Sequence, residues 1–243
     1  MRNLEKYEKD YNIPNFEDYQ IRYRKKKILS VLRDYKPQRI LEIGCGMEPI
    51  FPFVDWDYEK MVIVEPCDEF YKHAQSLINK DNTECLNEYF HQSDALKSCS
   101  FDFIICASLL HEVKNPAEIL ENIAAIATKD TVVHVNVPNA YSLHRIIAKE
   151  MGFIDDVHEM SDRNKLFQQN TVFDLEKLKK LVDKAGFEVL EEGSFFVKPF
   201  SHDQMYKMIQ SGIIDDNVLD GLYSLAKYIP SYGSEIYLNI KLK

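Results

Sequence analysis

The sequence predicts one α/β fold: a doubly wound, mostly parallel sheet of seven strands, with an antiparallel strand near its C-terminus. Three observations lead to this prediction. Short apolar runs alternate with helical patterns over residues 37–138. These runs are hydrophobic throughout, as in strands that are buried on both faces. Two later strand-like runs flank a helical stretch, which suits an antiparallel pair at one edge of the sheet.

Residues 1–36 are expected to form a helical cap, with a polar and aromatic arm followed by an amphipathic helix that Pro37 ends. The main domain then occupies residues 37–243. Its first part predicts strands at 39–43, 61–64, 84–91, 101–106 and 131–137, and helices at 68–79 and 116–128. Asp68 suits the N-cap of the first of these helices.

Residues 139–170 break the alternation and are expected to form a helix and a long loop that cover the sheet. A helix follows at 174–185, where Asp174 suits its start and Gly186 its C-cap. The remaining expected elements are strands at 188–197 and 232–242 and a helical stretch at 203–229.

The composition limits the classes of function. The chain has 243 residues, of which 45% are hydrophobic and 28% charged, as is usual for a soluble globular protein. Its net charge of -9 argues against a role in coating nucleic acid, because most of the surface would repel a polyanion. The basic run from Arg22 to Lys27 is expected to be a solvated helix face.

Neither a signal peptide nor a membrane-spanning segment is predicted, because the longest apolar run, Phe103–Leu110, is too short to cross a bilayer. We therefore expect a cytoplasmic protein, either a monomer or a homodimer. The 5 cysteines are odd in number and form no Cys-x-x-Cys pair, which argues against a disulfide framework or a zinc site. No metal is expected.

The strand at 39–43 runs directly into Gly44-Cys45-Gly46, a tight turn that lets a ligand approach the backbone closely. Glu65 ends the next strand, at the spacing where an acidic side chain binds ribose hydroxyls. A glycine pair alone is equally typical of an ordinary turn. The two features in this order favour a ligand that contains ribose.

The residues after Gly46 indicate the charge of that ligand. The third glycine of a nicotinamide fingerprint is absent, and Glu48 would place a negative charge beside a pyrophosphate. S-adenosylmethionine carries a sulfonium cation and no phosphate. Acidic side chains at Glu42 and Glu48 suit that cation and its ammonium group.

These segments resemble the motifs of the class I S-adenosylmethionine-dependent methyltransferase family. The matching segments are, in motif order, Leu41–Gly46, Val62–Pro66, Gln92–Leu96 and Phe101–Cys106, with Ser108–Val113 after the fourth. Glu48 stands where the first motif normally has its third glycine. His111 and Glu112 stand in the reverse of the family's usual order, so the usual role of that histidine is not transferred.

The resemblance implies a Rossmann-like fold that binds S-adenosylmethionine. Glu65 would bind the ribose, Asp94 would contact the adenine amino group, and the strand exit near Ala107 and Ser108 would line the methionine moiety. The residues expected to bind the cofactor are Glu42, Gly44, Cys45, Gly46, Glu65, Pro66, Asp94, Ala95, Ala107, Ser108 and Arg22.

The N-terminal cap is also implied to contribute to this cofactor site. Arg22 or Arg24 is expected to pair with the methionine carboxylate, and Tyr11 or Tyr19 to close over it. For any one of these residues, a surface helix position is the competing interpretation.

Methyl transfer is an in-line displacement, and an acceptor hydroxyl needs a base. His111 and His144 follow two of the strands at the carboxyl end of the sheet, where ligands bind, and are the candidate catalytic residues. A structural role is the alternative for each of them. His158 lies in the covering loop, and His134 is expected to be a core or edge residue.

The stretch Val137–Arg145 resembles small-molecule methyltransferases that modify bacterial surface sugars and secondary metabolites. The resemblance implies a small-molecule acceptor, first of all a hydroxyl of a sugar or glycan precursor. An N- or C-methyltransferase of another metabolite is the alternative. A nicotinamide-dependent oxidoreductase and a non-catalytic cofactor-binding module are further readings, the second suggested by Glu48.

Overall fold

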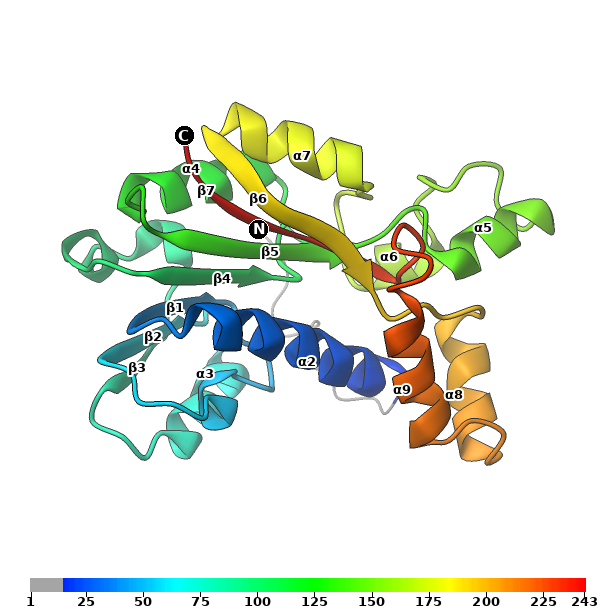
Figure 1. The fold of residues 1–243 in the computed structure, drawn as a ribbon, viewed down its shortest axis with the longest axis horizontal. Helices are drawn as coiled ribbons and strands as arrows, with labels where there is room; N and C mark the ends of the chain where they lie inside the picture. Colours follow the sequence, from blue (N-terminus) through cyan, green and yellow to red (C-terminus); the bar gives the residue numbers. More distant parts are fainter. Residues whose placement is uncertain (1–14) are drawn as a thin grey trace.

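A computed structural model describes residues 15–243, in which seven strands form one sheet (Figure 1). The order across the sheet is β3-β2-β1-β4-β5-β7-β6. The strands are β1 (Arg39–Ile43), β2 (Lys60–Val64), β3 (Thr83–Leu86), β4 (Phe103–Ala107), β5 (Val132–Pro138), β6 (Phe187–Phe195) and β7 (Glu235–Leu242). The first five are parallel, and β7 runs antiparallel to both β5 and β6. The predicted fold class is confirmed.

Helices cover both faces of the sheet and its carboxyl end (Figure 1). One face carries α2 (Glu17–Tyr35) and α3 (Asp68–Leu77), and the other carries α4 (Pro116–Ile126) and α7 (Leu175–Lys184). Four more helices lie beyond the end toward which β5 and β6 point: α5 (Leu143–Glu150), α6 (Asp162–Leu166), α8 (His202–Gln210) and α9 (Asp216–Leu225).

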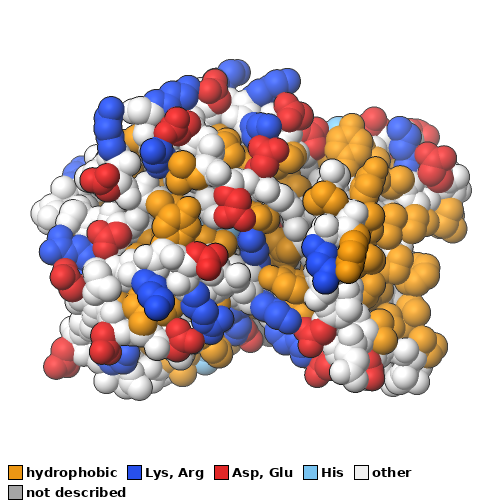
Figure 2. All heavy atoms as spheres, viewed as in Figure 1, with side chains coloured by type: hydrophobic (Ala, Val, Ile, Leu, Met, Phe, Trp, Pro, Cys, Tyr) orange, Lys and Arg blue, Asp and Glu red, His pale blue; other side chains and the backbone are white. Residues whose placement is uncertain are grey.

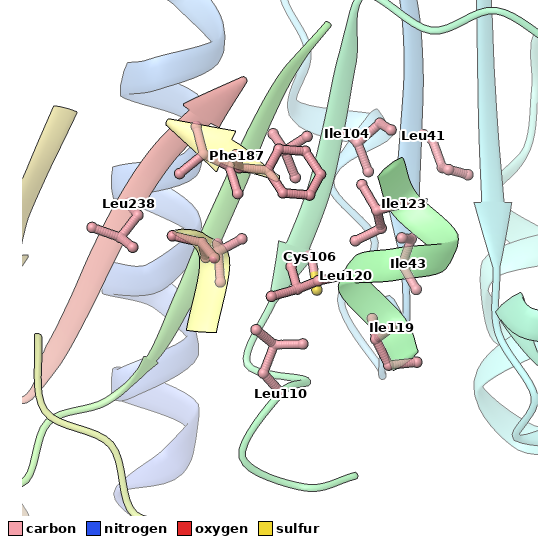
Figure 3. Packing of buried hydrophobic residues seen from close by; sticks show 14 of the residues in the cluster. Leu41, Ile43, Ile104, Cys106, Leu110, Ile119, Leu120, Ile123, Phe187 and Leu238 are labelled. Carbon is pink, nitrogen blue, oxygen red and sulfur yellow. The ribbon is translucent and has the colours of Figure 1, made fainter. Parts of the chain in front are cut away.

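Both faces of the sheet are packed, which explains the continuous apolar runs. On β4, Ile104 and Cys106 join the cluster under α4 and α7, part of which Figure 3 shows. Their neighbours Phe103 and Ile105 join the opposite cluster under α2 and α3. Successive residues of β4 therefore bury apolar side chains on opposite faces of the sheet.

A third hydrophobic cluster fixes the N-terminal half of α2 beside the last two strands. Tyr23 of α2 stacks on Phe196, with ring centroids 4.5 Å apart, and both side chains are fully buried. Met205 of α8 and Leu219 of α9 complete the cluster. It thereby holds α2, α8 and α9 together at the carboxyl end of the sheet.

The basic run on α2 is neutralised by carboxylates from other elements. Five of its six residues form ion pairs: Arg22 with Asp216, Arg24 with Glu235, Lys25 with Glu48, Lys26 with Asp220 and Lys27 with Glu191. On the face seen in Figure 2, positive and negative side chains are interspersed. The run is therefore not an uncompensated positive patch.

Several expected boundaries differ in the structure. The helical stretch at 203–229 is two helices, because the chain reverses at Gly212, whose φ of 73° is left-handed. The strand at 84–91 ends at Leu86. Asp68 is the first residue of α3, and Cys67 is its N-cap. Asp174 does cap α7, because its side chain accepts a hydrogen bond from Lys177 N at 2.7 Å.

The expected arm, including Tyr11, lies outside the described residues, so the division at residue 36 stays a prediction. Over residues 15–243, no helix is both long and apolar enough to span a membrane.

Gly233, just before β7, is expected to tolerate no side chain. A Cβ there would lie 2.5 Å from the Phe195 carbonyl oxygen and 2.6 Å from its amide nitrogen. Gly233→Ala should lower the free energy of unfolding in urea by about 1–3 kcal/mol, because backbone must move. The matched control is Gly221→Ala in α9, where nothing lies within 4 Å of the added Cβ; it should raise stability by roughly 0.5–1 kcal/mol. Equal stability of the two variants would contradict this reading.

Candidate active site

A cavity of about 730 Å³ opens at the carboxyl end of the sheet. Residues directly after β1, β2, β4 and β5 line it, together with the start of β7 and the N-terminal half of α2. This is where ligands bind in open α/β sheets, and the volume suits a cofactor with a small substrate.

The loop after β1 forms the tight turn expected from its glycines. Gly44 and Gly46 have φ values of 75° and 57°, a left-handed conformation that costs a glycine little. Glu65, at the end of β2, accepts hydrogen bonds from Gly46 N at 3.1 Å and Cys67 N at 2.9 Å. The Cys45 amide is a third backbone donor to Glu65, so about one of the four acceptor sites of the carboxylate is left for a further donor. Pro66 and Cys45 also line the cavity.

A second buried carboxylate, Glu42, lies under the same loop. One of its oxygens accepts a hydrogen bond from Ile50 N at 3.0 Å. Burial raises the pKa of Glu42 to about 8, and repulsion from Glu65 contributes. Burial also raises the pKa of Glu65, although the backbone donors of Cys67 and Gly46 oppose the shift. A cation in the cavity would favour the ionised form of both groups.

Glu48 lines the cavity as well, but its charge is compensated. The Lys25 ammonium group pairs with it and lies 3.8 Å from the centroid of the Phe53 ring. The sequence-based reasoning gave Glu48 a free negative charge beside the ligand. In the structure, Glu42 and Glu65 are buried acids of the cavity wall that no lysine or arginine of residues 15–243 pairs with.

The exit of β4 brings Ala107 and Ser108 to the cavity, as expected. Ser108 has a left-handed φ of 54°, which is uncommon for a residue with a side chain, and its amide donates to Asn136 O at 2.9 Å. The strained turn ends β4 and carries the chain toward His111.

Three expected cofactor residues are not brought to the cavity. The Asp94 side chain is 88% exposed and bonds Lys97, which lowers its pKa. Ala95 begins the short turn that carries this lysine. Arg22 is 42% exposed and pairs with Asp216 and the Tyr23 hydroxyl. His91 and Arg24, close to them in sequence, line the cavity instead.

Both candidate catalytic histidines line the cavity. His111 is buried, with its Nε2 3.8 Å from Glu112 Oε1. His144 is half-buried at the start of α5, and its buried Nδ1 has no hydrogen-bond partner among the described residues. Burial, and after it the positive charges of Lys198 and Arg145, hold the pKa of His144 well below its usual value.

The other two histidines considered do not line the cavity. His134 is buried in β5 and bonds Asn239 at 2.7 Å, as expected for a core residue. His158 bonds Asp174 and Asp156 in the loop after α5.

Tyr19 packs on Phe16 in the third hydrophobic cluster, with ring centroids 5.7 Å apart.

A buried ion pair forms part of the wall opposite the glycine loop. Glu235, at the start of β7, accepts hydrogen bonds from Arg24 Nε and Nη2 of α2 at 2.6–3.0 Å. Gln20 and Asn136 also donate to this carboxylate. The spacing of Glu17, Gln20 and Arg24 on one helix face is a sequence signal that could have identified this wall.

Next to that pair lies a chain of three polar side chains from three elements. Lys198 Nζ lies 2.7 Å from His202 Nδ1, and His202 Nε2 lies 3.3 Å from Glu17 Oε2. Burial lowers the pKa of His202 to about 3, so the ring is neutral. Its Nδ1 then accepts a hydrogen bond from Lys198. Arg163 of α6 lies 3.4 Å from the same Glu17 carboxylate.

The cavity therefore has two chemically distinct ends. The end formed by β1, β2 and β4 has a glycine turn and two buried acids with raised pKa values. The end formed by β5, β6, β7 and α2 carries arginine, lysine and histidine side chains. We call them the acidic end and the basic end.

Comparison with known proteins identifies the family of the chain. Residues 16–192 match the family model described as a methyltransferase domain. No curated protein matches the sequence significantly.

Solved methyltransferases share the fold at low sequence identity. The plantazolicin methyltransferase BamL, in complex with a triazolic desmethylPZN analogue and SAH, has a TM-score of 0.57 and 14% identity, over 93% of this chain and 90% of that chain. An S-adenosylmethionine-dependent methyltransferase from Clostridium acetobutylicum has a TM-score of 0.56 and 10% identity, over 91% of each chain. The N-terminal domain of EvdMO1, in the presence of SAH and D-fucose, has a TM-score of 0.54 and 13% identity, over 90% and 83%.

The family match covers the glycine turn, the two buried acids and both histidines, and the shared fold extends over most of the chain. The chain therefore belongs to the methyltransferase-domain family, as a class I S-adenosylmethionine-dependent methyltransferase.

Proposed function

We propose that this small-molecule methyltransferase binds its cofactor at the acidic end and methylates a hydroxyl group of a sugar or glycan precursor at the basic end. An N- or C-methyltransferase reaction on another metabolite is the alternative. The observation that carries the hydroxyl assignment is His144, a neutral histidine at the cavity wall with a buried nitrogen that bonds no described residue.

The acidic end fits the charge and the hydroxyls of S-adenosylmethionine. Three backbone amides hold the Glu65 carboxylate at the cavity wall, and its remaining acceptor site suits a ribose hydroxyl. Glu42 is a second buried acid of the same wall and would face the ammonium group. No lysine or arginine of residues 15–243 forms an ion pair with either acid, so a cationic ligand gains their attraction.

The basic end supports a polar acceptor. His144 and Lys198 offer donors and acceptors there, and Asn139 holds the wall by donating to Ser231 O and Gly233 O. D-Fucose is the sugar present with the EvdMO1 domain, whose fold is similar to that of this chain.

When bound, S-adenosylmethionine supplies a methyl group on a sulfonium, and the methyl carbon passes to the acceptor oxygen. The acceptor hydroxyl must lose its proton as the new C–O bond forms. His144 is neutral because burial and its cationic neighbours oppose its protonation, so it can accept that proton. A hydroxyl oxygen that has gained a methyl group and still carries its proton is an oxonium, which is a strong acid. A weak base is therefore sufficient to remove the proton. His111 is the second candidate base.

Glu65→Gln should weaken SAH binding by about 1–3 kcal/mol, since the charged acceptor for the ribose hydroxyls is lost. Calorimetric titration of SAH into each variant measures this change. Glu59→Gln is the control, because Glu59 pairs with Arg39 at the opposite end of the strands. Unchanged affinity in Glu65→Gln would show that this carboxylate does not hold the ribose.

Cofactor binding should release a proton from Glu42. Its pKa is about 8 in the free protein, and a bound ammonium group would lower it, so affinity should increase with pH up to about 8. Calorimetry in buffers of different ionisation enthalpy counts the released protons. Glu42→Gln should release fewer protons than wild type at pH 7, which corrects for ionisation of the ligand itself. Equal proton counts would contradict the assignment.

His144→Ala should lower kcat by about 10²–10⁴-fold with a smaller effect on cofactor affinity, as expected for a general base. The assay measures SAH formation with free sugars, sugar phosphates and nucleotide sugars, and with amines as the competing class. His158→Ala is the control, because His158 lies outside the cavity.

Turnover confined to amines would replace the hydroxyl proposal with N-methylation. Full turnover in both His144→Ala and His111→Ala would remove the general base, and catalysis would then rest on positioning alone.

A further inference from the structure

Lys198 is a buried cation that no carboxylate pairs with directly. It lies three residues beyond the end of β6, lines the cavity, and is only 1% exposed. Its Nζ bonds His202 Nδ1 and lies 5.4 Å from the centroid of the Phe16 ring. Within residues 15–243 it forms no ion pair. Burying an ammonium group in this way is costly unless an anion comes close to it.

The nearest acids are bound by other groups. Glu17 contacts Arg24, Arg163 and His202. Glu235 accepts from Arg24, Gln20 and Asn136. These contacts hold both carboxylates in the wall, so neither is available to move onto Lys198.

Six charged or titratable groups act on Lys198 from the elements around it. They are Glu17 on α2, His144 on α5, Arg163 on α6, His202 and Asp203 on α8, and Glu235 on β7. Burial lowers the pKa of Lys198 to about 7; Glu17, Glu235 and Asp203 oppose the shift, and Arg163 adds to it. Near neutral pH the amine therefore changes its protonation readily.

A second cation at this end also has no carboxylate within ion-pair distance in the described residues. Arg145, at the start of α5, donates to the carbonyl oxygens of Val157 and Glu159, and its side chain lines the cavity. Together with Lys198 it lowers the pKa of His144, so the two cations act on the same part of the cavity.

We propose that Lys198 binds an anionic group, a carboxylate or a phosphate, of the methyl acceptor, with Arg163 and Arg145 adding positive charge around it. A protonated lysine has three donors, and only one of them is used by His202. The inference rests on the proposed function and deepens it: the acceptor sugar or glycan precursor is an acidic one.

Binding of the anion then depends on pH. The anion bonds the protonated form of Lys198, so affinity is highest below the pKa of about 7 and falls up to tenfold for each pH unit above it. His202, with a pKa of about 3, stays neutral over this range. His144 stays neutral as well, because its pKa lies well below its usual value.

The test measures anion binding to the SAH-loaded protein by calorimetry, without turnover. The probes are D-glucuronate, D-glucose 6-phosphate, inorganic phosphate and acetate, with D-glucose as the neutral match. At least one anion should bind, and the acidic form of the sugar should bind at least tenfold more tightly than D-glucose. Comparison of glucuronate with the phosphate ester identifies which anionic group is preferred.

Lys198→Met should weaken binding of the anion tenfold or more, change the affinity for D-glucose much less, and remove the loss of affinity above pH 7. Lys198→Arg should bind the anion without that pH dependence. It keeps the test decisive if the Lys198→Met variant does not fold. Lys207→Met is the matched control, because Lys207 is an exposed lysine of α8 that does not line the cavity.

The proposal is overturned if no anion binds at tens of millimolar, if D-glucose binds as tightly as its acidic forms, or if Lys198→Met binds the anion as wild type does. Turnover of neutral sugars with no effect of Lys198→Met would leave the proposed function standing without this inference. Anion binding through Lys198 without turnover of any sugar would support the anion site and contradict the proposed sugar acceptor.

Discussion

The basic end of the cavity depends on the buried ion pair between Arg24 and Glu235. Glu235 is 2% exposed, and Arg24 bonds both of its oxygens. The pair joins α2, which comes early in the chain, to β7, which ends it. Loss of one partner would leave a buried charge without compensation, which is strongly destabilising. Because Arg24 also contacts Glu17, the same pair positions the carboxylate that faces His202.

Much of the fold and of the acidic end followed from the sequence, because their signals are local. The apolar runs located the strands, and their burial on both faces implied a parallel sheet. Gly44, Gly46 and Glu65 directly follow strands, so topology alone brings them to one edge. Asp94 has a motif position but lies in a short exposed turn, where Lys97 is its partner. A motif gives the order of residues, whereas the turn geometry decides where the side chain points.

The basic end was largely missed, because its residues are spread over α2, α5, α6, α8, β7 and the segment after β6. Nothing local relates Lys198 to Glu17 or Arg163 before the sheet order is known. Lys198 does interrupt an apolar run, and a charge in such a place is a usable signal of a buried polar contact. The sequence placed Glu48 beside the glycine turn but did not predict its pairing with Lys25, because that contact depends on how α2 crosses the loop. The nicotinamide-dependent alternative is not supported by the family match.

Adjacent residues of α2 reach opposite parts of the molecule: Arg24 bonds the start of β7, and Lys25 bonds the loop after β1. For protein engineering, this makes the two ends of the cavity unequal targets. Under the proposed function, residues after β5 and β6 are the ones to exchange for a different substrate, because they lie on other strands than the glycine turn. Changes on α2 do not have this independence, since the helix supports both walls. Under the proposed function, a redesign of substrate preference should therefore begin at Lys198 and Arg145 and leave His144 and α2 unaltered.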